Sequence, residues 1–263
     1  MNKTIKLFLD FYRFAKLNRV GILSGALAYF LFVSLVPFSF LLVFLSYKLG
    51  IDQRLLNGLF NGIFGSLSIA ITDAVAVKKA TVWLIILSIY SSTHFYFHLT
   101  SAGENIYKSE IKMGFKKRIK SFAYMLIVMF CLLCVLLINF IGKNFYELLK
   151  LPIFLTSLFN VATQMVVNLV LCFLLHRFAA PSFLRSKQLI KGWLLTFVLW
   201  ECVGLFFSLY LNFSASASSS AYLARAVVFT LYLYLLMQGF VYGVIFNSYA
   251  RLGGINERWP TNN

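Results

Sequence analysis

Six apolar runs, each about as long as a membrane-spanning helix, dominate the hydrophobic pattern of this 263-residue chain. A helix of about 20 apolar residues crosses the hydrocarbon core of a bilayer. The alternating pattern of a membrane barrel is absent from the sequence, and backbone hydrogen bonding in lipid then requires helices. The pattern predicts an all-α, multi-pass membrane protein with a single integral membrane domain over residues 1–263, a bundle of six transmembrane helices at about 25–47, 80–100, 121–141, 153–176, 189–212 and 223–249.

Two amphipathic stretches lie outside these runs. In residues 3–19 the apolar positions repeat at helical spacing with cations between them, which predicts an N-terminal interfacial helix on the cytoplasmic side. In residues 48–79 apolar positions recur three and four apart, while Asn57, Asn61 and Ser66 occupy the other side. These polar residues and several glycines favour an amphipathic helix on the outer surface over a seventh span.

One acidic residue, Glu201, lies near the middle of the run 189–212. A charge at the centre of a spanning helix costs at least about 2.5–3.5 kcal/mol, so such a residue is a functional-site hypothesis. Gly204, Ser208 and Asn212 follow at spacings of three and four, which places the carboxylate on a small, polar helix face. The alternative is a buried carboxyl that hydrogen-bonds a neighbouring helix and only helps the bundle to pack.

Other polar residues fall at a matching depth. Gln164, Glu201 and Gln238 each lie within about two residues of the midpoint of their runs, so at about 1.5 Å per residue they predict one polar layer. Asn168 follows Gln164 by one helical turn. The hypothesis is a polar cavity in which Glu201 binds a proton, a cation or a substrate headgroup.

Small residues and one proline predict how the helices pack. Gly239 and Gly243 form a small-xxx-small pair in the last run, which allows close approach of another helix. Pro37 lies inside the first run, where neighbouring helices can support a kink.

Composition and charge narrow the class of protein. The chain is 60% hydrophobic with a mean hydropathy of +0.82, which excludes a soluble globular domain. Seventeen of the 24 lysines and arginines fall in segments on one side, so the positive-inside rule predicts that both termini are cytoplasmic. Membrane lipids with anionic headgroups are the expected partners of these basic inner loops, and nucleic acid is not expected.

Metal, redox and hydrolytic chemistry have little support in the sequence. His94 and His98 have the spacing of paired metal ligands, but no acidic residue lies between them and ordinary hydrogen bonding is favoured. Cys131 and Cys134 form a CxxC inside an apolar helix. The sequence contains no phosphate-binding glycine loop and no Ser/His/Asp constellation. We therefore expect no metal, no cofactor and no enzyme activity.

Three stretches resemble the YihY/BrkB family of bacterial inner-membrane proteins: LAYFLFVSLVPF, AGENIYKSE with the following KKRIKSF, and LWECVGLFFSLYL. The matching positions are Ala28, Tyr29, Ser34, Leu35 and Pro37 in the first, Asn105 and Tyr107 in the second, and Glu201 and Tyr210 in the third. The outer loop and Tyr222 fit the next segment. The order of these short motifs over most of the chain carries the resemblance.

The resemblance implies a six-helix protein of the bacterial inner membrane. Family members have been labelled virulence-associated or, in older naming, ribonuclease BN. A ribonuclease mechanism conflicts with these residues, because the sequence shows no His/Asp metal cluster and no soluble catalytic domain. The family commonly ends its last span with Gly-Ala-Glu, whereas Ile245, Phe246 and Asn247 stand here. Asn247 therefore joins the candidate binding residues, and Glu201 is left as the intramembrane carboxylate.

Three functions from different classes follow, and the third of them is a membrane enzyme that acts on a lipid-linked substrate. The first is a permease or a lipid- or amphiphile-handling transporter with a polar midplane site at Glu201. The second is a membrane scaffold that binds a partner protein and transports nothing.

Overall fold

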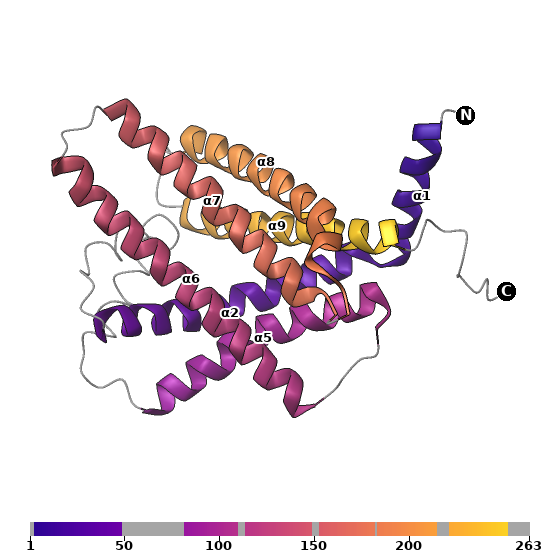
Figure 1. Ribbon diagram of the computed structural model, residues 1–263, viewed down its shortest axis with the longest axis horizontal. Coiled ribbons are helices and arrows are strands. Elements are labelled where there is room, and N and C mark those ends of the chain that lie inside the picture. Colours follow the sequence, from indigo (N-terminus) through magenta and orange to yellow (C-terminus); the bar gives the residue numbers. More distant parts are fainter. Residues whose placement is uncertain are drawn as a thin grey trace. The chain divides into compact units, whose positions relative to one another are not determined.

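The computed structural model describes residues 3–48, 82–109, 114–148, 153–181, 183–214 and 221–251, and these contain helices and no strand. The elements are α1 (Lys3–Leu17), α2 (Val20–Lys48), α5 (Val82–Tyr107), α6 (Phe115–Leu148), α7 (Ile153–Ala179), the 3₁₀ helix η1 (Ser186–Leu189), α8 (Ile190–Ser214) and α9 (Ala221–Arg251) (Figure 1).

Each of the six apolar runs corresponds to one of the long helices, although Leu189 belongs to η1 and residues 80 and 81 lie outside the described part of the chain. Four stretches in the described residues are long and apolar enough to cross a membrane: Val20–Leu41, Val161–Ala179, Ser186–Tyr210 and Val227–Arg251. Helices α5 and α6 contain 26 and 34 residues but are not among these four, and α5 is diluted by polar residues such as Ser91, Ser92 and His94. The structure therefore shows an all-helical membrane protein, and the count of six spans stays a prediction. The predicted outer helix within 48–79 lies outside the described residues, apart from Lys48.

The chain forms two compact units. The first contains residues 1–32, 98–112 and 169–263, and the second contains residues 33–97 and 113–168. Helices α2, α5 and α7 contribute residues to both.

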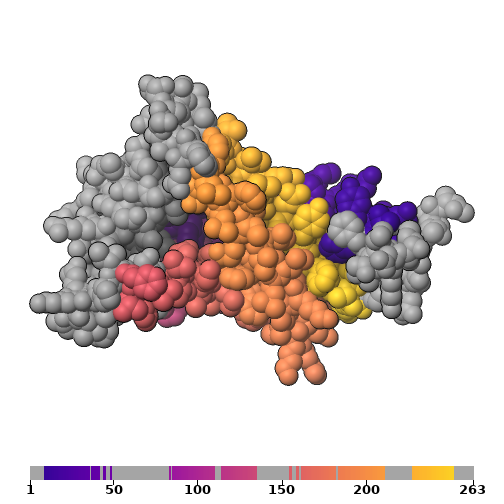
Figure 2. Space-filling view, turned by 90° about the horizontal axis from the view of Figure 1, so that it is seen from above, coloured from indigo at the N-terminus to yellow at the C-terminus, as the bar shows by residue number. Residues whose placement is uncertain are grey.

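The centre of the first unit is the pair α8 and α9, which lie side by side (Figure 1 and Figure 2). Both are apolar almost throughout, as expected for helices in lipid. The α9 side chains Met237, Phe240, Val241, Val244 and Ile245 are at most 1% exposed. On α8, by contrast, Leu205 and Phe206 are exposed, and apolar side chains of this kind meet lipid in a membrane. This unit therefore packs around α9.

Helix α1 lies against the C-terminal part of α9 in the same unit (Figure 2). Phe11 is within ring-contact distance of Tyr242, Phe246 and Tyr249, and Phe14 is buried beside Tyr249. Arg13 and Lys16 of α1 are exposed. Residues Lys3–Leu17 are helical, and Phe11 and Phe14 pack against α9, while Leu9 and Leu17 are exposed. The place of α1 at the membrane surface remains a prediction.

The second unit contains the rest of α2, α5 and α7 with α6. Helix α2 continues through Pro37, and the hydroxyl of Ser39 donates to the Leu35 carbonyl oxygen at 2.8 Å. Met125, Val128, Met129 and other buried side chains of α6 form its core, while Phe130 is 70% exposed. Apolar side chains on the outside are what a lipid environment requires, since only water penalises their exposure.

Candidate functional site

Glu201 lies on α8 and is partly buried. Its carboxylate is close enough to Cys172 on α7 and to Tyr232 on α9 for its charge to act on both side chains. The carboxyl group therefore lies within electrostatic range of side chains on α7 and α9. In that position it can hold a proton, a cation or a cationic headgroup.

The contacts of Trp200, the residue before Glu201, define the level of the carboxylate along α9. The Trp200 indole N–H donates to the Leu236 carbonyl oxygen at 2.8 Å. A methyl group built at Gly239 would also lie 3.5 Å from the Trp200 ring. Gln238 falls between these two α9 residues, so Glu201 and Gln238 share one level of the α8–α9 pair. Gln238 is half-buried and makes no hydrogen bond to any described residue.

The described residues of the small, polar face that follows Glu201 on α8, Gly204 and Ser208, are not covered by other described parts of the chain. No atom lies within 4 Å of a methyl group built at Gly204, and Ser208 is exposed. The side chain of Asn212 lies outside the described residues.

Gln164 and Asn168 belong to the second unit, unlike Glu201 and Gln238. Gln164 is exposed on α7, and its amide nitrogen donates to the Asn168 side-chain oxygen at 3.4 Å, one turn along the same helix. The four residues of the predicted polar layer therefore fall into two pairs, one in each unit, and a cavity shared by both pairs stays a prediction.

Asn247 is buried, and both ends of its amide are occupied. Its oxygen accepts from the backbone N–H of Gly192 at 2.7 Å, and its nitrogen donates to the Leu189 carbonyl oxygen at 3.1 Å. The contacts lie at the start of α8, where backbone N–H groups lack a partner within the helix. Asn247 therefore joins α9 to the first turn of α8, and these two hydrogen bonds fix the orientation of its side-chain amide.

A second buried polar cluster joins α7, α8 and α9 and was not singled out from the sequence. His176 is 1% exposed, with Nδ1 at 2.9 Å from the Cys172 carbonyl oxygen and Nε2 at 3.3 Å from Oγ1 of Thr196. Thr196 Oγ1 also lies 3.3 Å from the Gly239 carbonyl oxygen. A carbonyl only accepts, so the hydrogen-bond network assigns the ring proton to Nδ1, and Nε2 and the Gly239 carbonyl oxygen are both acceptors within reach of the one hydroxyl proton of Thr196.

Glycines allow this cluster to form. A methyl group at Gly243 would collide with Thr196 Oγ1 and with the carbonyl oxygen of Gly192, and one at Gly192 would collide with the carbonyl oxygen of Gly243. The backbones of α8 and α9 therefore touch at these two residues. Gly243 is one of the two glycines that the sequence singled out for helix packing, whereas Gly192 was not singled out.

The paired histidines are each engaged by other residues. His94 Nε2 lies 3.1 Å from an Nη atom of Arg118, and the His98 ring stacks on Phe30 with centroids 3.5 Å apart. Cys131 and Cys134 are half-buried on α6. Among the described side chains, no group of three or more His, Cys, Asp or Glu residues is placed to hold a metal ion.

Comparison with known proteins gives one family. Residues 11–258 match the family described as virulence factor BrkB, so the match covers nearly the whole chain. Neither the curated proteins nor the solved structures contain a significant match.

Proposed function

The chain belongs to the BrkB virulence factor family of helical membrane proteins, and on this premise we propose that it is a permease for a lipid or another amphiphile and not an enzyme. The observation that carries the proposal is the position of Glu201, a partly buried carboxylate within an apolar stretch long enough to span a membrane, whose charge acts on Cys172 and Tyr232. A purely structural bundle gains little from a carboxylate at this depth, because the charge is costly there.

Gln238 supports this reading. Its amide is half-buried at the level of Glu201 and is not hydrogen-bonded to described residues. A carboxylate and an amide on adjacent helices can together bind a polar headgroup or a cation. We place this site in the bacterial inner membrane, with both termini in the cytoplasm, because the basic residues gather in the segments on the side of the termini.

Reconstitution tests the proposal directly. Wild-type protein in vesicles is expected to move a fluorescent phospholipid or another amphiphile between leaflets faster than protein-free vesicles do. Glu201→Gln keeps the shape and removes the charge, and we expect it to lower that rate at least about tenfold, which corresponds to about 1.4 kcal/mol in the barrier. Asp10→Asn on α1 is the control, since it removes the same charge outside the spans. The proposal fails if the wild-type protein moves none of the tested lipids and amphiphiles.

The alternative is a scaffold that transports nothing, and the interhelical hydrogen bonds of the first unit favour it. The indole N–H of Trp193 donates to the Leu169 carbonyl oxygen at 2.8 Å, and Trp200, Thr196 and Asn247 make comparable contacts. Such contacts hold a bundle in one arrangement. Glu201→Cys and Gln164→Cys, in protein whose own cysteines are replaced by serine, separate the two functions. A permease exposes at least one of these thiols to a water-soluble reagent, and a scaffold exposes neither from either side.

A further inference from the structure

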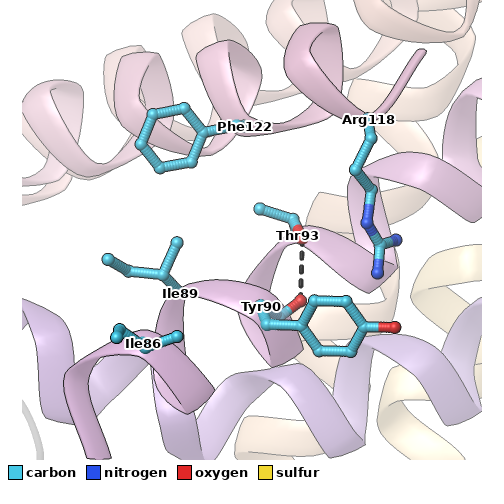
Figure 3. A pocket seen from close by; sticks show the side chains of 6 residues that line it. All are labelled: Ile86, Ile89, Tyr90, Thr93, Arg118 and Phe122. Atoms are coloured by element: carbon cyan, nitrogen blue, oxygen red, sulfur yellow. Dashed lines mark hydrogen bonds between the residues drawn. The ribbon is translucent and has the colours of Figure 1, made fainter. Parts of the chain in front are cut away.

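A groove of about 300 Å³ lies between α5 and α6 in the second unit (Figure 3). Its walls are Ile86, Ile89, Tyr90 and Thr93 of α5 with Arg118 and Phe122 of α6. The Thr93 hydroxyl donates to the Tyr90 carbonyl oxygen at 2.7 Å, so it is already used within its own helix. The groove therefore presents hydrocarbon along its length and one cation, Arg118.

Arg118 lies at the end of the groove nearest the connection between the two helices. Helix α5 runs toward that connection and α6 runs away from it, so Ile86 and Phe122 lie farther from it than Thr93 and Arg118 do. If α5 and α6 cross the membrane as the sequence predicts, this end is at the cytoplasmic surface and the apolar end is deeper.

The guanidinium of Arg118 is held in place by side chains that leave donors free. It lies 4.4 Å from the Tyr90 ring centroid and 5.4 Å from that of Phe97, and it donates one hydrogen bond, at 3.1 Å, to His94. None of the described carboxylates pairs with it. A guanidinium has five N–H donors, so the described side chains leave several of them for a phosphate, which Arg binds in a two-pronged geometry.

The surroundings of Arg118 are also cationic. Lys116 and Lys120 are exposed on the same turns of α6, and Lys117 is buried with its ammonium 5.0 Å from the Phe97 ring centroid. The first turn of α6 contains no acidic residue. The positive charges of Arg118, Lys116 and Lys120 favour an anionic ligand group, and the apolar wall of the groove favours a hydrocarbon chain.

We propose that this groove, which we call the Arg118 groove, binds one anionic phospholipid, with the phosphate on Arg118 and part of one acyl chain along Ile86, Ile89 and Phe122. The inference rests on the proposed lipid-handling function for its ligand class. The groove volume is at the low end of about 300–1,000 Å³ for small-molecule sites, which suits part of one chain. A soluble phosphate compound leaves the apolar wall uncovered, and a zwitterionic lipid leaves the positive charge uncompensated.

The test uses the full-length protein in nanodiscs of phosphatidylcholine that contain a phosphatidylglycerol probe with a photoactivatable acyl chain. Mass spectrometry then maps the labelled residues. We expect labels on the peptides of Ile86, Ile89 and Phe122, about tenfold above those from a phosphatidylcholine probe with the same chains, because both lipids offer Arg118 a phosphate but the choline cation of phosphatidylcholine is repelled by the guanidinium beside it. Equal labelling by the two probes, or labels elsewhere only, overturns the proposal.

Two matched variants locate the charge. Arg118→Gln is expected to reduce the preference for phosphatidylglycerol to about one, while Lys116→Gln, which removes the same charge from an exposed position two residues away, leaves it within about twofold. An equal loss in both variants means that net charge alone attracts the lipid, and it refutes the site.

A third variant tests the groove without touching the charge. Ile89→Trp fills the groove and keeps Arg118, so both probes should lose their labels there even if Arg118→Gln fails to fold. Unchanged labelling refutes the site. Binding in nanodiscs requires no transport, so the two proposals can fail separately. An absence of flux in vesicles refutes the permease and leaves the lipid site unaffected. Absent labelling of the groove together with intact flux refutes the lipid site and leaves the permease unaffected.

Discussion

The side-chain oxygen of Asn247 on α9 accepts a hydrogen bond from the backbone N–H of Gly192 on α8 at 2.7 Å, across 55 positions of sequence. The nitrogen of the same amide donates to the Leu189 carbonyl oxygen at 3.1 Å. An amide both accepts and donates, so it suits a place that offers one N–H and one C=O. A carboxylate only accepts.

Asn247→Asp is therefore expected to destabilise the protein, because a carboxylate cannot donate to Leu189 and is buried. Leaving a buried acceptor unpaired costs about 1–3 kcal/mol, and more for a charged group. Thermal unfolding in detergent measures the loss. Asn105→Asp makes the same chemical change at an exposed residue of α5 and should leave the midpoint nearly unchanged. Similar shifts in the two variants would contradict the assigned contacts.

Gly243→Ala should separate α8 from α9, because the new methyl group collides with backbone and side-chain atoms of α8. Overpacking of this kind costs about 1–3 kcal/mol. Gly204→Ala on α8 is the control, since a methyl group there meets no atom within 4 Å and should be neutral or stabilising by up to about 1 kcal/mol. The unfolding midpoints of the two variants are expected to move in opposite directions or by clearly different amounts.

Thr196→Val keeps the side-chain shape and removes the hydroxyl that lies between His176 and Gly239. We expect a loss of about 1–2 kcal/mol in stability, since Thr196 is fully buried and the loss of its hydroxyl leaves the buried Nε2 of His176 without this hydrogen-bond partner. Thr163→Val, at a half-buried threonine of α7 that makes no hydrogen bond to a described residue, should change the unfolding midpoint little. An unchanged unfolding midpoint in Thr196→Val would show that the Thr196 hydroxyl contributes nothing to stability.

The buried hydroxyl of Tyr107 should make the stability of the folded protein depend on pH in the alkaline range. This hydroxyl is buried without a hydrogen-bond partner among the described residues. Burial raises the pKa of Tyr107, while the positive charge of nearby Arg251 opposes the rise. A raised pKa in the folded protein means that stability is lost as pH rises above about 10, the ordinary value for tyrosine. Tyr107→Phe should be neutral or stabilising at neutral pH and should reduce the alkaline loss of unfolding temperature. Tyr12→Phe, at an exposed tyrosine, should do neither.

Much of the helical architecture was predictable, because length and apolarity decide whether a segment can cross a bilayer. The run 153–176 corresponds to α7 at Ile153–Ala179, and 189–212 corresponds to α8 at Ile190–Ser214. The helix boundaries beyond these runs were not predicted, since helices continue past the apolar stretch. Helix α6 extends from Phe115 to Leu148, well beyond the predicted 121–141.

The candidate site was predictable only in part. Glu201 was noticeable because a carboxylate is rare in a spanning segment. His176 was not, since a histidine at the end of an apolar run gives no sign of whether it meets a threonine on another helix. Gly192 also resembled any other glycine near a helix start, and only its contact with Gly243 shows why a side chain is excluded there.

The sequence by itself determined that this protein is helical and lies in a membrane, because bilayer thickness and backbone hydrogen bonding leave apolar segments no other structure. It also determined which side chains are costly in lipid, Glu201 above all. Only the tertiary structure decided which of them meet. Asn247 reaches the start of α8, Gln164 pairs with Asn168 within α7, and Arg118 borders an apolar groove. The physical reason is that hydrogen bonds and ring contacts form between helices distant in sequence, and helical periodicity does not specify which faces come together.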